Sequence, residues 1–212
     1  MKSGVSTEMH NERDNGLHAK TLSCVRGDKL LFRNLNFALT PGQAALVTGP
    51  NGVGKSSLLR LIAGLLHPFS GTIETPESTA LCDDRMALDE NLPLGKALQF
   101  WARIDGKNAD HCSTAMAAAG MKHLAEVPIR YFSTGQRQRA RLARTFLTEA
   151  NLWLLDEPAN GLDKASVELL GRTLQAHLDR GGMILAASHI TLPIDFDLSL
   201  ELTAPETLDA PL

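Results

Sequence analysis

The first part of the chain alternates apolar and polar residues, and this pattern predicts β-strands. Residues 17–25 and 30–39 both repeat with a period of two, the period of side chains on a strand with one buried face. Gly27 and Asp28 separate the two stretches and suit a tight turn. We therefore expect an antiparallel pair of strands here.

Shorter apolar runs predict a second set of strands. Ala44–Thr48 follows a turn at Pro41 and Gly42, and it is apolar enough for a strand buried in a parallel sheet. Residues 71–81 read as one or two short strands in a hairpin, and residues 197–202 are a candidate edge strand. Two more core strands are expected at 152–155 and Met183–Ala187.

Helical spacing of apolar residues marks five other segments: 55–66, Leu94–Ile104, 109–119, 135–148 and 164–178. The first places its apolar side chains on one face, formed by Leu58, Leu59, Ile62, Ala63 and Leu66. The order of elements predicts an α/β fold, with a doubly wound parallel sheet, an antiparallel β subdomain and an inserted helical subdomain at about 88–150. Residues 17–203 should form one domain without internal repeats.

Both ends of the chain differ from this pattern. Residues 1–16 are polar and charged and lack the apolar stretch of a secretory signal, so we expect a flexible tail. Residues 204–212, with Pro205 and Pro211, are expected to be loose. No run reaches the roughly 18 apolar residues that a spanning helix needs. The chain is therefore expected to be soluble by itself and to act at a membrane only through a partner.

Composition narrows the classes of partner. The 212 residues carry a net charge of −3 at pH 7, and 5% of them are aromatic. A nucleic-acid partner is not expected, because no basic field or base-stacking surface is evident. Three widely separated cysteines, Cys24, Cys82 and Cys112, lack metal-ligand or redox spacing. They are interpreted as isolated thiols in a reducing compartment.

One motif carries most of the chemistry. The strand at Ala44–Thr48 runs into a segment that satisfies the phosphate-binding pattern G-x-x-x-x-G-K-[ST] at every fixed position. Its backbone N–H groups and the following helix N-terminus form an anion site, in which Lys55 approaches the β- and γ-phosphates and Ser56 binds Mg²⁺. The strand before and the helix after argue against a chance glycine loop. The nucleotide-binding segment is Gly49, Pro50, Asn51, Gly52, Val53, Gly54, Lys55, Ser56 and Ser57.

Two carboxylates follow a later apolar strand. Asp156 ends the strand at 152–155 and suits Mg²⁺, while Glu157 suits the activation of a water for attack on the γ-phosphate. Taken alone, Asp-Glu-Pro would be a surface turn. The phosphate-binding motif upstream favours the catalytic interpretation.

A serine, a glycine and a glutamine precede the basic helix at 135–148. Ser133 is a good N-cap residue, and with Gly135, Gln136 and the helix N-terminus it could form a second anion site. A plain capped helix is the alternative when this segment is considered alone.

With these motifs in order, residues 17–203 resemble an ABC-family nucleotide-binding domain. The resemblance implies that Ser133, Gly135 and Gln136 are signature residues, which close on the γ-phosphate held by a second copy of the chain. It implies a D-loop at 160–163 with Asp163, and a switch histidine at His189. A lone histidine is more often structural, so His189 rests on its place in this series.

Within that family, segments 22–32, 58–65 and 152–158 resemble the ATP-binding subunits of haem exporters for cytochrome c maturation. This implies an ATPase with ATP and Mg²⁺ as cofactors, a head-to-tail dimer, an integral membrane permease as partner and a place on the cytoplasmic face of the inner membrane. The helices from residue 94 to residue 119 and the region of Asp83 would form the docking groove. The rival class is a soluble ABC ATPase that acts as an assembly factor or scaffold without transport.

Three positions depart from the usual family pattern. Arg26 stands where an aromatic residue often stacks on adenine, and a guanidinium could stack there or simply be solvated. The stretch 81–85 lacks the usual glutamine, which leaves Asp83 as a further candidate metal ligand or a surface turn. Thr134 replaces a commoner glycine in the signature. The missing glutamine and a short hairpin at 71–81 are what favour the rival class.

Overall fold

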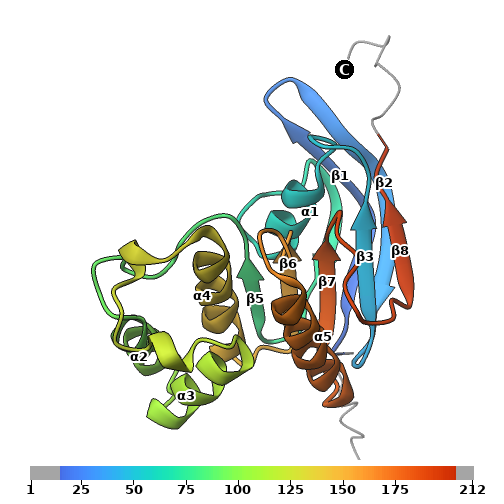
Figure 1. The fold of residues 1–212 in the computed structure, drawn as a ribbon. Helices are drawn as coiled ribbons and strands as arrows, with labels where there is room; N and C mark the ends of the chain where they lie inside the picture. Colours follow the sequence, from blue (N-terminus) through green and yellow to red (C-terminus); the bar gives the residue numbers. More distant parts are fainter. Residues whose placement is uncertain (1–14, 204–212) are drawn as a thin grey trace, which may run out of the picture.

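The computed structural model describes residues 15–203, so the expectations for residues 1–14 and 204–212 lie outside the described residues. Two sheets and a group of helices build the domain (Figure 1). Among residues 15–203, no helix is both long enough and apolar enough to cross a membrane.

An antiparallel sheet forms first along the chain. It consists of β1 (Leu17–Arg26), β2 (Lys29–Leu39) and β4 (Ser70–Glu74) in the order β2-β1-β4. The β1–β2 pair closes with Arg26 opposite Lys29, on either side of the turn that the sequence predicted. The expected antiparallel pair is confirmed.

The second sheet is parallel and has the strand order β5-β6-β7-β3-β8. The candidate edge strand is indeed at its edge, as β8. The five strands are β3 (Ala44–Thr48), β5 (Thr79–Cys82), β6 (Leu152–Asp156), β7 (Met183–Ala187) and β8 (Leu198–Glu201).

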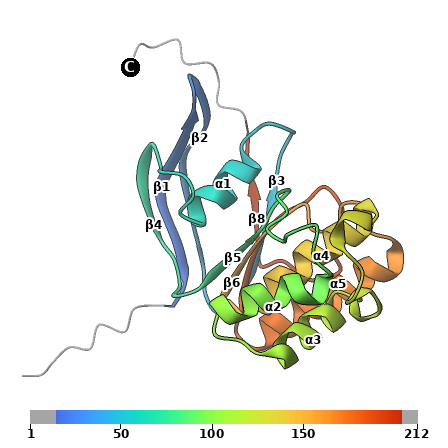
Figure 2. The same ribbon diagram turned by 90° about the vertical axis from the view of Figure 1, so that its left-hand side faces the viewer.

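Alternation along the parallel strands separates two hydrophobic cores. In β6, Leu152 and Leu154 pack toward the antiparallel sheet, whereas Trp153 and Leu155 pack toward the helical subdomain. Helix α1 (Lys55–Ile62) lies between the two sheets (Figure 2). Both faces of the parallel sheet are covered, which explains why its strands are apolar throughout.

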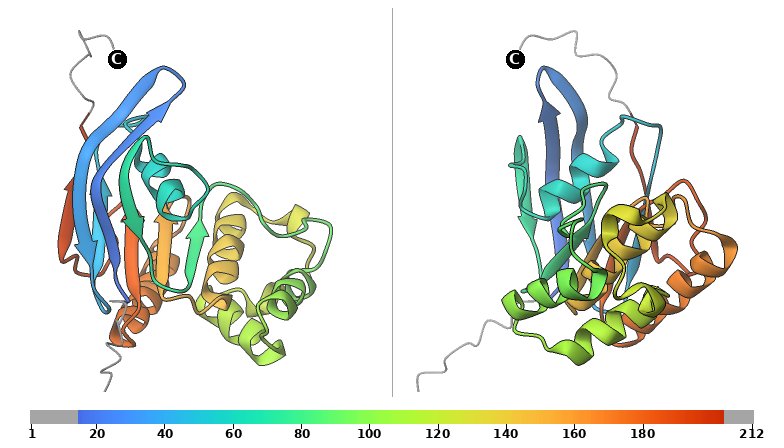
Figure 3. Two further views of the ribbon diagram at one scale, coloured as in Figure 1. Left: turned by 180° about the vertical axis from the view of Figure 1, so that it is seen from behind. Right: turned by 60° about the vertical axis from the view of Figure 1, so that its left-hand side comes forward.

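The helical subdomain is inserted between β5 and β6, at the end of the parallel sheet opposite β8 (Figure 3). After β6, helix α5 (Lys164–Asp179) covers the sheet on the side away from α1. The inserted elements are α2 (Leu94–Ile104), α3 (Ala109–Ala118), the 3-10 turns η1 (Lys122–Leu124) and η2 (Ile129–Tyr131), and α4 (Thr134–Leu147).

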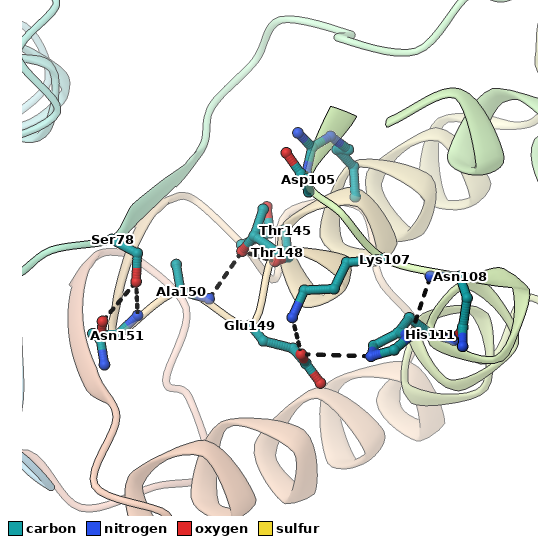
Figure 4. A network of polar contacts seen from close by, with 11 residues as sticks. Ser78, Asp105, Lys107, Asn108, His111, Thr145, Thr148, Glu149, Ala150 and Asn151 are labelled. Carbon is teal, nitrogen blue, oxygen red and sulfur yellow. Dashed lines mark hydrogen bonds and ion pairs between the residues drawn. The ribbon is translucent and has the colours of Figure 1, made fainter. Parts of the chain in front are cut away.

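Polar contacts fix the return of the chain from α4 to β6 (Figure 4). The Asn151 N–H donates to Ser78 Oγ at 3.0 Å. Lys107, before α3, forms an ion pair with Glu149, and His111 Nε2 lies 3.9 Å from the same carboxylate. The first contact joins the segments that lead into β5 and β6, and the ion pair joins the segment before α3 to the segment between α4 and β6.

Two details of the prediction are wrong. Residues 71–81 do not form a hairpin, because β4 pairs with β1 whereas β5 pairs in parallel with β6. Pro76 lies between them and has no N–H for a continuing ladder, and the apolar β5 is taken up by the parallel sheet.

The helix predicted at 55–66 ends at Ile62 instead. Gly64 has a φ of 71°, and the Leu65 N–H donates to the Arg60 carbonyl at 2.9 Å. This is a glycine-terminated helix end in a Schellman motif, which stops the helix although apolar residues continue beyond it.

Candidate active site

The phosphate-binding loop connects β3 to α1. Gly49 has a φ of 131°, and a Cβ there would lie 2.3 Å from the Leu202 carbonyl oxygen, so packing within the chain already requires glycine. No side chain caps α1, and its first turn contains no acidic residue. The N–H groups of this helix end therefore remain available for an anion, as the motif predicts.

Lys55 is buried at the base of this loop. Its Nζ donates to the carbonyls of Gly49 at 2.9 Å and Pro50 at 3.3 Å, and lies 3.0 Å from His189 Nε2. An ammonium group has no acceptor, so a hydrogen bond with Lys55 requires an unprotonated Nε2 on His189. Asn51 Oδ1 lies 2.8 Å from the same nitrogen and is an acceptor, so it would need a proton on Nε2. The contacts of Nε2 with Lys55 and with Asn51 are therefore alternatives set by the tautomer.

Glu157 stands at the end of β6, beside His189. Its backbone is left-handed, with a φ of 49°, and its N–H donates to the Ala187 carbonyl at 2.8 Å. One carboxylate oxygen accepts the His189 N–H at 3.1 Å, and the other lies 3.5 Å from His189 Nε2. The structure thus brings together three predicted residues from three segments: Lys55, Glu157 and His189.

Asp156 and Ser56 meet at the same edge of the parallel sheet. Burial raises the pKa of the Asp156 carboxyl above its ordinary value, and a hydrogen bond with the Ser56 side chain opposes that rise. A hydroxyl and a carboxylate side by side are oxygen ligands of the kind that Mg²⁺ prefers.

These groups open into a cleft of about 460 Å³. A larger cavity of about 760 Å³ lies between α3, α4 and α5, and it contains none of the predicted site residues. The smaller cleft is therefore the site supported by the chemistry. Its lining residues are Ser56, Arg60, Asp84, Thr134, Gln138, Arg141, Asp156, Glu157 and Asn160.

The predicted signature segment forms the start of α4. Ser133 is the N-cap, its hydroxyl accepts the Gln136 N–H at 3.3 Å, and Gln136 Oε1 accepts the Ser133 N–H at 2.9 Å. The N-cap prediction is confirmed. Ser133 and Thr134 are exposed, while the role of this segment toward a second copy stays a prediction.

The signature segment packs against the predicted D-loop of its own chain. A Cβ on Gly135 would lie 2.7 Å from the Gly161 carbonyl oxygen, so this position admits only glycine without a shift of the backbone. Asp163 caps α5 and accepts the Ser166 N–H at 2.8 Å, and this bond holds the pKa of its carboxyl below the ordinary value. Asp163 therefore has a structural role as the cap of α5, and this role does not depend on any contact with a second copy of the chain.

Two predicted residues remain, and neither lines the cleft. Arg26 is exposed at the β1–β2 turn, and its contact with adenine stays a prediction. Asp83 follows β5 and pairs with Arg60 at 3.0 Å. Its role as a metal ligand also stays a prediction.

Gln138 is a site residue that sequence reasoning missed. It is 4% exposed, and its amide donates to the Pro158 carbonyl at 3.1 Å and, with longer geometry, to the Glu157 carbonyl at 3.4 Å. It thereby supports the backbone that carries Glu157. The sequence contained one signal for Gln138, which is a polar residue on the side of a helix that faces the core.

Known proteins share both the sequence and this arrangement. The sequence profile of the ABC transporter family matches residues 32–160, which include the phosphate-binding loop, the signature segment and both carboxylates. The chain is 53% identical over 168 residues to the cytochrome c biogenesis ATP-binding export protein CcmA of Zymomonas mobilis, a match that covers 79% of this chain and 76% of the relative.

The chain belongs to the ABC transporter family. It is also 48% identical over 180 residues to CcmA of Novosphingobium aromaticivorans, which covers 85% of this chain and 92% of the relative. An inward-facing ABC transporter of the metal-chelate type has the same fold, with a TM-score of 0.77 at 26% identity over 89% of this chain and 80% of that one.

As an ABC ATP-binding protein, the chain is an ATPase, and the predicted fold class is confirmed. The antiparallel sheet, the parallel sheet with its phosphate-binding loop and the inserted helices are the parts expected of such a domain. Thr134 of the signature segment lines the same cleft as Glu157 of the same subunit.

Proposed function

We propose that this chain is the energy subunit of a membrane ABC exporter for cytochrome c biogenesis, with haem as its cargo. The observation that carries the proposal is the convergence of Lys55, Glu157 and His189 beside an intact phosphate-binding loop. The kinship with two relatives named as cytochrome c biogenesis export proteins supports the choice of pathway.

Hydrolysis in this site is a matter of positioning and charge. Lys55 neutralises the β- and γ-phosphates, and Glu157 accepts a proton from the water that attacks the γ-phosphate. The His189 backbone holds the Glu157 carboxylate through a 3.1 Å hydrogen bond. The imidazole would contact the γ-phosphate, as expected of the switch histidine.

Ser56 and Asp156 would hold Mg²⁺, whereas Asp83, the other candidate from the sequence, is paired with Arg60. Within residues 15–203 no group of three or more His, Cys, Asp or Glu side chains is placed to hold a metal ion. A sparse protein ligand set fits Mg²⁺, which usually keeps several waters and binds substrate phosphates. When bound, Mg²⁺ neutralises charge that develops on the phosphates.

Two copies would assemble head to tail around two ATP molecules. The signature residues would then meet the γ-phosphate bound by the other copy: Ser133, which is exposed, and Gly135 and Gln136, which are half-buried. The N-terminus of α4 suits this role, because its N–H groups carry partial positive charge toward an anion. ATP binding closes this dimer, and hydrolysis with product release opens it.

An integral membrane permease would dock on the helical subdomain, and the chain would then lie on the cytoplasmic face of the inner membrane. Helix α2 leaves Phe100 and Ile104 57% and 60% exposed, and their spacing puts both on one helix face. Trp101 Nε1 donates to the Ala87 carbonyl at 2.9 Å and so links α2 to the loop that follows Asp83. Two large apolar side chains exposed on one helix face are typical of a surface that binds another protein.

Complementation tests the pathway. In cells that lack their own cytochrome c biogenesis exporter ATPase, the parent chain should restore covalent haem on c-type cytochromes, whereas Glu157→Gln should not. Restoration by Glu157→Gln, or none by a parent chain that hydrolyses ATP when purified, would overturn the proposal.

Co-purification tests the partner and the rival function, a soluble scaffold ATPase. From a detergent extract, the chain should recover a multi-span membrane protein, and Phe100→Ser with Ile104→Ser should lose it. Gln99→Ser, at an exposed polar position on the same helix, is the matched control and should keep it. A wholly soluble complex would favour the scaffold.

A further inference from the structure

The acidic loop after β5 is anchored to the helix that follows the phosphate-binding loop. Arg60 of α1 donates to Asp83 Oδ2 from Nε at 3.3 Å and from Nη2 at 3.0 Å. The two side chains are only 26% and 10% exposed, so the pair is better shielded than a surface ion pair. Arg60 also reaches Asp84 at 3.0 Å, but that side chain is 83% exposed.

The same residue is anchored to the signature helix. Arg141 of α4 donates from Nη1 to the Asp83 carbonyl at 3.2 Å. Asp83 therefore contacts α1 through its side chain and α4 through its backbone. Arg60 is in the last turn of α1 and Arg141 is in the middle of α4, and both line the cleft. The two contacts therefore join the helix that follows the phosphate-binding loop to the helix that follows the signature segment.

We propose that Asp83 is a positioning residue, which with Arg60 and Arg141 forms a clamp between α1 and α4. The clamp sets where the signature segment stands relative to the ATP held in its own subunit. Asp83 lies in the stretch 81–85, which lacks the glutamine usual in the family, and its side chain makes the connection to α1 through an ion pair. The inference rests on the proposed role of Ser133 toward a second copy.

The hydrogen bonds of Asp83 distinguish this role from metal binding. Oδ2 accepts both Arg60 donors, and Oδ1 accepts the Arg85 N–H at 3.1 Å. Both carboxylate oxygens are therefore already engaged, and metal binding would have to break a shielded ion pair. Metal binding by Ser56 and Asp156 would not have to break an ion pair of this kind.

A double-mutant cycle tests the clamp. Asp83→Asn and Arg60→Gln should each lower kcat for ATP by about 5-fold, and the double variant should be no worse than either single variant, because contacting residues are coupled. The Mg²⁺ concentration for half-maximal activity should stay unchanged. The Hill coefficient for ATP should fall toward 1 in all three variants, because closure of one copy on the other is impaired.

Matched controls separate the clamp from a fold defect. Asp195→Asn makes the same change of side chain at an exposed position outside the cleft and should behave like the parent chain. Arg60→Lys keeps the charge but cannot reproduce two donors to one oxygen, so its kcat should lie between the parent and Arg60→Gln. Urea midpoints should be similar for all variants that are compared.

Three outcomes would overturn the clamp. A raised Mg²⁺ requirement in Asp83→Asn but not in Arg60→Gln would make Asp83 a metal ligand. If kcat in the double variant falls by the product of the two single-variant factors, the two residues act independently. Failure of the proposed dimer is distinguishable, since the parent chain would then hydrolyse ATP without cooperativity before any variant is compared.

Discussion

Lys55 Nζ lies 3.0 Å from His189 Nε2, although one residue follows β3 and the other follows β7. The two strands are neighbours in the parallel sheet, so their carboxyl ends bring both side chains to the same edge. Glu157 arrives at this edge from β6, the strand on the other side of β7. Strand order therefore assembles the site.

Glu157→Gln should abolish turnover while keeping ATP binding. The amide oxygen can still accept the His189 N–H, but the side chain can no longer take a proton from water. We expect kcat to fall by about 10²- to 10⁴-fold, the usual contribution of a general base. Steady-state ATPase and equilibrium binding of ATP measure the two effects, and unchanged turnover would contradict the assignment.

Lys55→Ala, by contrast, should lose ATP binding, because the substitution removes the cation that contacts the β- and γ-phosphates. Equilibrium binding of ATP measures this loss as well.

Replacement of Ser133 can separate its two roles. Ser133→Ala removes the cap and should lower the free energy of unfolding by about 1 kcal/mol, whereas Ser133→Gly should cost only a few tenths. Both lack the hydroxyl, so both should lower ATPase if that group meets the γ-phosphate of the other copy. If Ser133→Gly retains full ATPase, the serine is a cap alone.

Gly135→Ala should impair the site through packing within one subunit. The new Cβ would lie 2.7 Å from the Gly161 carbonyl oxygen, so the signature helix or the D-loop must move. We expect a loss of about 1–3 kcal/mol in unfolding free energy, together with reduced ATPase. Thr134→Ala, the adjacent control, only removes atoms and should change the urea midpoint little. Equal stability of Gly135→Ala and the parent would contradict the contact.

His177 should make the fold sensitive to acid. Its ring stacks on Trp153 at 3.7 Å, and burial lowers its pKa to about 4 from an ordinary 6.5, because the charged ring loses water. The neutral ring thus contributes stability above pH 6.5, which is lost as the pH falls toward 4. The loss is at most about 3 kcal/mol.

Urea midpoints measured between pH 7 and pH 4 test this expectation. His177→Phe keeps an aromatic ring beside Trp153 and should show a flatter pH dependence. His123→Gln, at an exposed position, is the control and should keep the slope of the parent chain. The same slope in all three proteins would exclude His177 as the acid-sensitive group.

Much of the site was readable from sequence because its parts are local. The phosphate-binding loop needs glycines, a lysine and a serine in consecutive order, and Ser133 with Gln136 forms a cap within one helical turn. Gln138, Arg60 and Arg141 were missed for the opposite reason. Each acts on a partner distant in the chain, and an isolated polar residue on a helix does not reveal which carbonyl or carboxylate it will meet.

The sequence by itself determined the elements and the chemistry, because side-chain period, glycine placement and capping are local properties. Only the tertiary structure decided that β4 and β5 belong to different sheets, since pairing depends on which edge is free. It alone joined Asp83 to α1 and α4, and it stacked His177 on Trp153. Contacts of this kind are chosen by the packing of whole elements, which no short segment of sequence encodes.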